Sequence, residues 1–243
     1  MLFFSYCAKL LQTKGDDTLI KRKERGSLII ISGTTCAGKG TVIKHLLERN
    51  KNLYLSISYT SRPKRNNETD GIDYYFVTPE EFQRKIDHGD FLEYAQVQYG
   101  CYYGTPKKEI EEKLEKGIDV ILEIDVEGAK QVKTLFPETI LIFIMAPSME
   151  EVKRRIKMRN TENAEQIIKR FKKAYNEINE VNKYNYVVIN DYVDEAVKKI
   201  EAILISEKCR VDRIEEISVE SEEEIIHEFL IEKEFDNEKK PIV

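Results

Sequence analysis

Features that mark several protein classes are missing from this sequence of 243 residues. Its few cysteines are far apart and show no paired spacing, so neither a disulfide framework nor a zinc site is indicated, and a reducing cytoplasm is the expected setting. They are Cys7, Cys36, Cys101 and Cys209. The apolar opening, 1–11, is short and lacks both a basic start and a small-residue cleavage site, so we predict no export signal and no membrane span.

A large excess of charge of one sign is missing too. The chain carries 39 basic and 44 acidic residues, which leaves a net charge of −5 although 34% of its residues are charged. This balance argues against a protein that binds nucleic acid through bulk electrostatics, so any basic site must be local. Hydrophobic residues make up 41% of the chain, enough to bury one core, and we expect one domain with inserted lobes.

Short apolar segments alternate with segments of helical periodicity. The continuous apolar run 28–31 is typical of a strand buried on both faces of a parallel sheet, and a glycine-bearing loop and a helix near 42–47 follow it. Further strands are predicted at 120–124, 140–144 and 186–189, and helices at 148–159, 162–183 and 194–207. The alternation predicts an α/β fold, a three-layer sandwich with a parallel sheet.

Composition divides the chain into three parts. Residues 1–26 are predicted to be a flexible extension, because 12–26 is polar and rich in charge. The folded domain is predicted at 27–207, with a core of 27–55 and 107–207 and a small, tyrosine-rich β lobe inserted at about 56–106.

The remaining segment, 208–243, is acidic but keeps apolar residues at helical spacing. They are Ile225, Ile226, Phe229 and Leu230. An amphipathic helix beginning near Ser221 is therefore predicted, docked on its own subunit or on a second copy in a homodimer. A solvated acidic tail is the alternative.

A phosphate-binding loop is indicated between the first strand and the first helix. The stretch matches G-x-x-x-x-G-K and comprises Gly33, Thr34, Thr35, Cys36, Ala37, Gly38, Lys39, Gly40 and Thr41. Glycines let backbone N–H groups point at phosphate oxygens, while the helix N-terminus and Lys39 supply positive charge. An ATP site is expected here.

Position 40 departs from the pattern, since Gly40 stands where a Ser or Thr hydroxyl usually binds magnesium. We expect Thr41 to contact a nucleotide phosphate instead. Mg²⁺ would then depend on water, phosphate and a carboxylate, for which Glu123 is the candidate.

A second anion site is indicated at 58–74, where two arginines stand three apart with a serine before them and a tyrosine after. Guanidinium groups bind phosphate oxygens bidentately, and hydroxyls complete the shell. Taken alone, such a stretch is also common on solvated loops.

The motifs together resemble the guanylate kinase family, over about 27–205. In order they are the phosphate loop, S-x-x-x-R-x-x-R-x-x-E-x-x-G-x-x-Y at 58–74, Glu93-Tyr94-Ala95, Tyr102-Tyr103-Gly104-Thr105 and the acidic strand end Glu123-Ile124-Asp125. The resemblance implies that the β lobe binds the phosphate and base of GMP. The residues it assigns there are Ser58, Arg62, Arg65, Glu68, Tyr74, Glu93, Tyr103, Thr105 and Asp125. Guanine donates from N1 and N2 to a carboxylate and accepts at O6 from a hydroxyl, which suits Glu93 and Thr105.

The resemblance also implies a helical lid at about 148–172 whose arginines close over ATP. They are Arg155, Arg159 and Arg170, with Lys39 as the fourth catalytic residue and Asn190 touching adenine. Asn160 and the stretch Thr34-Thr35-Cys36 depart from the usual family residues, which are glycine at the first place and proline, serine and glycine at the second.

The implied function is Mg²⁺-dependent phosphorylation of GMP by ATP, and the resemblance leaves open whether dGMP is used as well. We weigh two alternatives: a nucleoside monophosphate kinase of other base specificity, since Gly40-Thr41 also resembles adenylate kinases, and a non-catalytic binding module. Lys39, the complete phosphate loop and the lid arginines favour the enzyme. A large RNA footprint does not fit the acidic balance, so we predict no nucleic acid partner.

Overall fold

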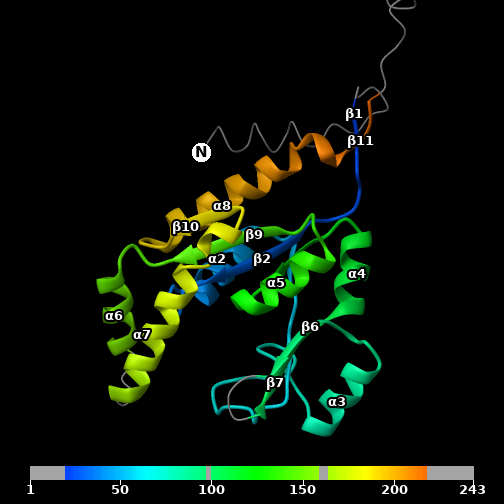
Figure 1. Ribbon diagram of the computed structural model, residues 1–243. Coiled ribbons are helices and arrows are strands. Elements are labelled where there is room, and N and C mark those ends of the chain that lie inside the picture. Colours follow the sequence, from blue (N-terminus) through cyan, green and yellow to red (C-terminus); the bar gives the residue numbers. More distant parts are fainter. Residues whose placement is uncertain (1–19, 97–99, 159–163, 218–243) are drawn as a thin grey trace, which may run out of the picture. The chain divides into compact units, whose positions relative to one another are not determined.

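The computed structural model describes residues 20–96, 100–158 and 164–217 (Figure 1). The predicted C-terminal helix and most of the predicted N-terminal extension lie outside this part of the chain. The chain divides into two compact units, one formed by 24–206 and the other, within the described residues, by 20–23 and 207–217.

The larger unit is built on the predicted parallel sheet. Its strands are β2 (Leu28–Gly33), β3 (Leu53–Leu55), β8 (Asp119–Leu122), β9 (Ile140–Met145) and β10 (Tyr186–Ile189), in the order β10-β9-β2-β8-β3 and all parallel. The predicted α/β class is confirmed. The edge strand β3 was not foreseen, because three residues are too short to show a periodicity.

Helices cover both faces of this sheet. On one face, Ile29 and Ile31 of β2 pack in a cluster with α2 (Lys39–Arg49) and α8 (Val193–Lys208). On the other, Leu28 and Ile30 pack with α4 (Lys107–Glu115) and α5 (Val126–Leu135). Since successive residues of a strand point to opposite faces, one apolar run serves two layers of core.

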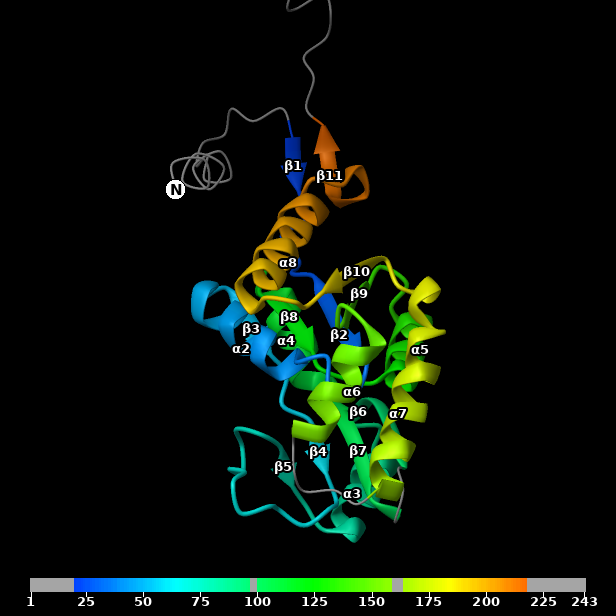
Figure 2. The same ribbon diagram turned by 90° about the vertical axis from the view of Figure 1, so that its left-hand side faces the viewer.

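The inserted lobe is a separate four-stranded sheet, seen below the core in Figure 2. Its strands are β4 (Tyr59–Thr60), β5 (Tyr75–Phe76), β6 (Phe91–Gln96) and β7 (Tyr102–Pro106), in the order β5-β4-β7-β6. A helix, α3 (Pro79–Asp87), packs on it through Phe82, which stacks on Phe91 and Tyr102 at centroid distances of 4.5 and 5.3 Å. A Cβ at Gly104 would come within 2.9 Å of Phe82, so the glycine admits this aromatic stack.

Two helices occupy the region predicted as the lid, α6 (Met149–Met158) and α7 (Ala164–Ile178). Val152 and Ile156 of α6 pack with Ala174 of α7 in a third apolar cluster. The predicted helix 162–183 was too long: it ends at Ile178, and a 3₁₀ turn at Val181–Lys183 follows before the chain enters β10.

The smaller unit contains an antiparallel pair, β1 (Ile20–Arg22) and β11 (Ile214–Ile217), with a 3₁₀ turn at Val211–Arg213 before β11. Residues 20–22 therefore form a strand where a flexible extension was predicted. None of the helices in the described ranges combines the length and apolar character needed to cross a bilayer.

Candidate functional site

The phosphate loop joins β2 to α2 by a backbone path that glycine makes possible. A Cβ on Gly33 would lie 1.9 Å from the carbonyl oxygen of Ile144, so no larger residue fits beside β9. Gly38 caps α2 in the left-handed region, at φ 83°. The first turn of α2 contains no acidic side chain, which leaves its N-terminal N–H groups available for an anion.

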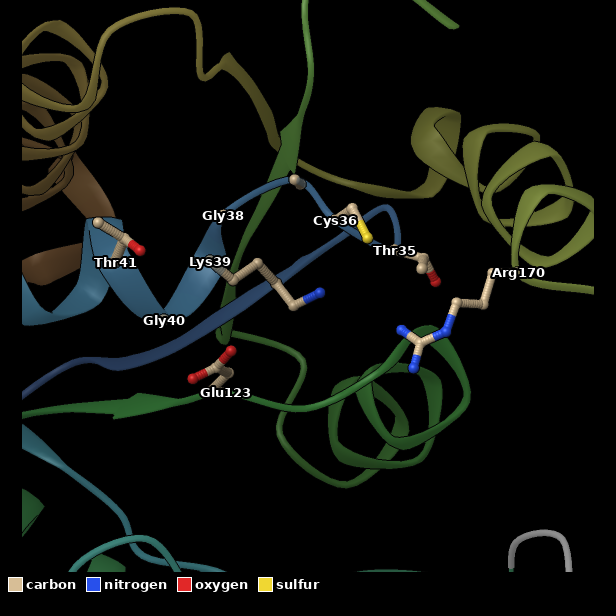
Figure 3. A pocket seen from close by; sticks show the side chains of 9 residues that line it. Thr35, Cys36, Gly38, Lys39, Gly40, Thr41, Glu123 and Arg170 are labelled. Carbon is tan, nitrogen blue, oxygen red and sulfur yellow. The ribbon is translucent and has the colours of Figure 1, made fainter. Parts of the chain in front are cut away.

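A cavity of about 340 Å³ opens over this loop (Figure 3). Its lining comprises Thr35, Cys36, Ala37, Gly38, Lys39, Gly40, Thr41, Glu123 and Arg170. In Figure 3 the Lys39 ammonium and the Arg170 guanidinium both extend into the space beside the loop, and the Glu123 carboxylate lies below Lys39. Residues 35–41 of the predicted loop are thus brought together with one predicted lid arginine, whereas Gly33 and Thr34 are not among the lining residues.

The charges in this cavity influence one another. Burial lowers the pKa of Lys39, whose ammonium donates to the Gly33 carbonyl at 3.1 Å, while Glu123 acts in the opposite direction. Glu123 lines the cavity, and burial of its carboxylate raises its pKa. The positive charge of Lys39 lowers the same pKa by a smaller amount. The Glu123 carboxylate stands beside a cation and a phosphate loop, and the positive charge of a metal ion bound to a nucleotide would favour its ionised form.

The back of the loop is held by two predicted ATP-site residues. The Asn190 amide donates to the Ala37 carbonyl at 2.7 Å, and Arg155 donates to the same carbonyl at 3.3 Å and to the Asn190 carbonyl at 2.9 Å. Arg155 also pairs with Glu151 at 2.6 Å. In this structure Arg155 therefore supports the loop from α6 and is not among the residues that line the cavity.

A second cationic centre lies in the β lobe around Arg62. Its guanidinium binds both carboxylate oxygens of Glu68, at 2.7 and 2.5 Å, and donates to the Tyr103 hydroxyl at 2.9 Å. It also lies 5.2 Å from the centroid of the Tyr74 ring. The hydrogen bonds from Arg62 hold the pKa of Glu68 at about 2, so this pair is charged near neutral pH.

A buried acid lies in the same lobe. Glu93 of β6 is 7% exposed and accepts a 2.5 Å hydrogen bond from the hydroxyl of Thr105, its partner in the β6–β7 ladder. Burial raises the pKa of Glu93 to about 7, and the nearby charge of Asp125 adds to the shift. Its other oxygen faces α5, where a Cβ on Gly128 would approach it to 3.0 Å.

The remaining predicted residues have less defined roles. Asp125 accepts from the N–H groups of Glu127 and Gly128, both at 3.1 Å, so it caps α5 as well as standing near Glu93. Arg65 is largely exposed, 3.9 Å from Glu68, and Ser58 directly precedes β4. Thr34 is fully buried. Arg159 lies outside the described residues.

One contact at the loop was not predicted. Glu177 of α7 accepts from the backbone N–H of Thr35 at 2.7 Å and from the Thr35 hydroxyl at 3.1 Å. In sequence Glu177 is an ordinary carboxylate on an amphipathic helix. Only its seven-residue spacing from Arg170, which places both on one face of α7, could have indicated a shared target.

Comparison with known proteins gives one consistent result. The family model described as guanylate kinase matches residues 25–207. A protein of Clostridium perfringens named guanylate kinase is 54% identical over 87% of this chain and 97% of its own length. Another of that name, from Clostridium tetani, is 57% identical over 85% of this chain and 99% of its own length.

A solved structure agrees with these sequence matches. The crystal structure of guanylate kinase from Anaplasma phagocytophilum superposes with a TM-score of 0.67 and 34% identity, covering 82% of this chain and 93% of that one.

Proposed function

Because this chain belongs to the guanylate kinase family, we propose that it is a guanylate kinase, which transfers the terminal phosphoryl group of ATP to GMP. The observation that carries the proposal is the pairing of two different anion sites in one unit. One is the cavity over the phosphate loop with Lys39, and the other is the Arg62 centre beside the buried acid Glu93.

The donor, ATP, binds on the phosphate loop. Backbone N–H groups at 38–41, where the loop ends and α2 starts, receive the phosphates, and Lys39 neutralises the outer ones. Arg170 stabilises the negative charge that spreads over the transferred group, since it lines the same cavity. Arg155 and Arg159 join Arg170 at the transferred group when the lid helices close. Asn190 contacts the adenine base.

Magnesium fits this cavity as a partner of the nucleotide. Among the described residues no group of three or more His, Cys, Asp or Glu side chains could hold a metal ion. Mg²⁺ commonly takes one or two carboxylates together with phosphates and water, and Glu123 is the carboxylate that lines the cavity, with Thr41 nearby. When bound, Mg²⁺ supplies charge neutralisation on the phosphates.

The acceptor, GMP, binds in the β lobe. Its phosphate is received by Arg62, Arg65 and the hydroxyls of Ser58, Tyr74 and Tyr103. Glu68 orients the Arg62 guanidinium, which leaves its Nε edge directed to Tyr103. Glu93, in its charged form, accepts from guanine N1 and N2, while Thr105 and Asp125 complete base recognition. The 2′-hydroxyl is not required by this set, so dGMP is included.

Transfer between two bound nucleotides needs in-line positioning and exclusion of water more than a protein base. The lobe and the lid helices flank the core, and their closure over both substrates keeps water from the terminal phosphate of ATP. We propose a cytoplasmic location, supported by the wide spacing of the cysteines. The homodimer remains a prediction, because the helix expected to form it lies outside the described residues.

A coupled assay of ADP release with GMP, AMP, UMP and dTMP offered in turn tests the function. We expect GMP to exceed AMP by at least about 100-fold in kcat/KM, because AMP leaves the buried Glu93 without donors. A preference for AMP would indicate a kinase of other base specificity. Binding of GMP without any ADP release would indicate the non-catalytic module.

Thiol labelling tests the placement of ATP. Cys36 lines the cavity, and its sulfur lies between Lys39 and Thr35 in Figure 3. Bound ATP should therefore protect Cys36 from alkylation and alkylated protein should lose ATP binding, as measured by peptide mass spectrometry and calorimetry. Cys209 is exposed and serves as the internal control. Equal labelling of Cys36 with and without ATP would place the nucleotide elsewhere.

Removing the partner of Arg62 tests the acceptor site. In Glu68→Ala the Arg62 guanidinium loses its bidentate contact, so we expect KM for GMP to rise about tenfold while KM for ATP stays within about twofold. Glu80→Ala, which removes an exposed carboxylate from α3 of the same lobe, is the matched control. Equal rises in both KM values would point to a general loss of structure.

A further inference from the structure

Glu177 contacts the phosphate loop through a single carboxylate oxygen, Oε2. This oxygen accepts both the N–H of Thr35 at 2.7 Å and the Thr35 hydroxyl at 3.1 Å. The side chain is only 11% exposed, and Oε1 lies 3.8 Å from the Lys173 ammonium. The proposed chemistry of the two nucleotides does not use this carboxylate.

The same helix face reaches the loop at further points. Arg170 precedes Glu177 by seven positions, about two helical turns, and lines the cavity together with Thr35. Between them in sequence, Phe171 and Ala174 belong to the apolar cluster of α6 and α7, against which Cys36 also packs. One helix therefore holds two consecutive loop residues, Thr35 and Cys36, and also presents an arginine to the cavity that they line.

The loop needs such support where Glu177 provides it. Cys36 has φ 63°, and it is the one residue other than glycine with positive φ among the described residues. L-amino acids adopt this region only when the surroundings hold them there. The hydrogen bonds that Glu177 accepts fix Thr35, and packing against the α6–α7 cluster holds Cys36 itself.

We propose that Glu177 is a positioning residue that holds the phosphate loop at Thr35 and keeps α7, with Arg170, aligned on the ATP cavity. The proposal rests on the ATP-binding role of the loop given above. The positive charges of Lys173 and Lys39 compensate the carboxylate, so it does not repel the nucleotide. A carboxylate that competed with phosphate for the Thr35 N–H would have the opposite effect on ATP binding.

Substitutions of Glu177 in the full chain distinguish support of the loop from competition with phosphate for the Thr35 N–H. We expect Glu177→Ala to raise KM for ATP about tenfold, the usual order for losing charge-assisted hydrogen bonds, with KM for GMP within about twofold. Glu177→Gln keeps an acceptor oxygen and should recover most of the loss. Glu180→Ala removes a nearby carboxylate that pairs with Lys130 and Lys183 and not with the loop, and should match the wild type.

A second readout does not depend on turnover. The rate of Cys36 alkylation in nucleotide-free protein should rise in Glu177→Ala and not in Glu180→Ala, because the released loop samples more conformations. If Glu177→Ala does not fold, Glu177→Asp makes the test. It keeps the charge but shortens the side chain by one methylene, so it should also raise KM for ATP.

The results of these experiments distinguish a failure of the Glu177 proposal from a failure of the proposed function. An unchanged KM for ATP with unchanged labelling would overturn the proposal, and tighter ATP binding in the Ala or Asp variant would show that Glu177 competes with phosphate. A wild-type protein that releases no ADP with GMP would contradict the proposed function, whereas the labelling comparison would still test the contact between Glu177 and the loop.

Discussion

Lys39→Ala is expected to lower kcat by a factor of at least about 100, the usual order for removing one preorganised donor to transition-state charge. Lys39 supplies the flexible positive charge of the phosphate loop, and its ammonium lies over the cavity within 3.1 Å of the Gly33 carbonyl. Arg170 lines the same cavity but comes from α7, so we do not expect it to take the place of Lys39 beside the loop. GMP binding should be nearly unchanged, because the acceptor lobe does not include Lys39.

Steady-state rates of ADP release and calorimetry with GMP make this test. Lys44→Ala removes an exposed lysine from the same helix and is the control for general effects of charge and helix stability. Retention of more than about a tenth of the wild-type rate in Lys39→Ala, a loss of under roughly 1.4 kcal/mol, would remove Lys39 from the catalytic set. A parallel loss of GMP affinity would mean that the substitution disturbs the fold.

Much of the donor site could be predicted because it is local in sequence. The buried run 28–31, the glycines at 33 and 38 and the periodicity of α2 are contiguous, and each agrees with a strand, loop and helix in that order. Parallel neighbours of β2 then follow from further apolar runs of the same kind. The sheet order and the edge strand β3 depend on pairing across long stretches of chain, which no local pattern encodes.

The contacts missed by sequence have different physical causes. Glu177 is one of many carboxylates on charged helices, and only the packing of α7 against the loop selects it. The pairing of β1 with β11 joins segments almost 200 positions apart, since Ile20 pairs with Ile217. Asp125 shows a third case, because a side chain assigned to the base by resemblance also caps α5.

Glu93→Gln is expected to reverse part of the base preference. The charged carboxylate of Glu93 accepts from both guanine donors, whereas an amide accepts with one group and presents its own N–H to the other. We expect the ratio of kcat/KM for GMP to that for AMP to fall by about 10- to 100-fold, the range given by losing one hydrogen bond to a charged group. Glu127→Gln, an exposed carboxylate on α5, should leave the ratio unchanged.

The raised pKa of Glu93 adds a dependence on pH. Below pH 7, where the pKa of Glu93 lies, the carboxylate becomes protonated and loses one acceptor, so the GMP to AMP ratio of the wild type should fall as the pH is lowered. Both substrates carry the same phosphate, so its own titration cancels in the ratio. The ratio for Glu93→Gln should depend much less on pH between about 6 and 8, because the amide at position 93 does not ionise.

As the pH rises, the free energy of unfolding of the wild type should fall while its preference for GMP over AMP increases. Because burial raises the pKa of Glu93 in the folded protein above its value in the unfolded chain, the folded state holds the proton more tightly. Its contribution to the free energy of unfolding is therefore largest below about pH 4.5 and is lost as the pH rises towards 7. At pH 8 the wild type holds a buried charge that Glu93→Gln lacks, so the variant should be more stable by on the order of 1–3 kcal/mol.

Denaturant unfolding at pH 5 and pH 8 measures this difference in stability between Glu93→Gln and the wild type. A variant that is less stable than the wild type at pH 8, with an unchanged GMP to AMP ratio, would show that Glu93 is a structural acid and that guanine is read elsewhere.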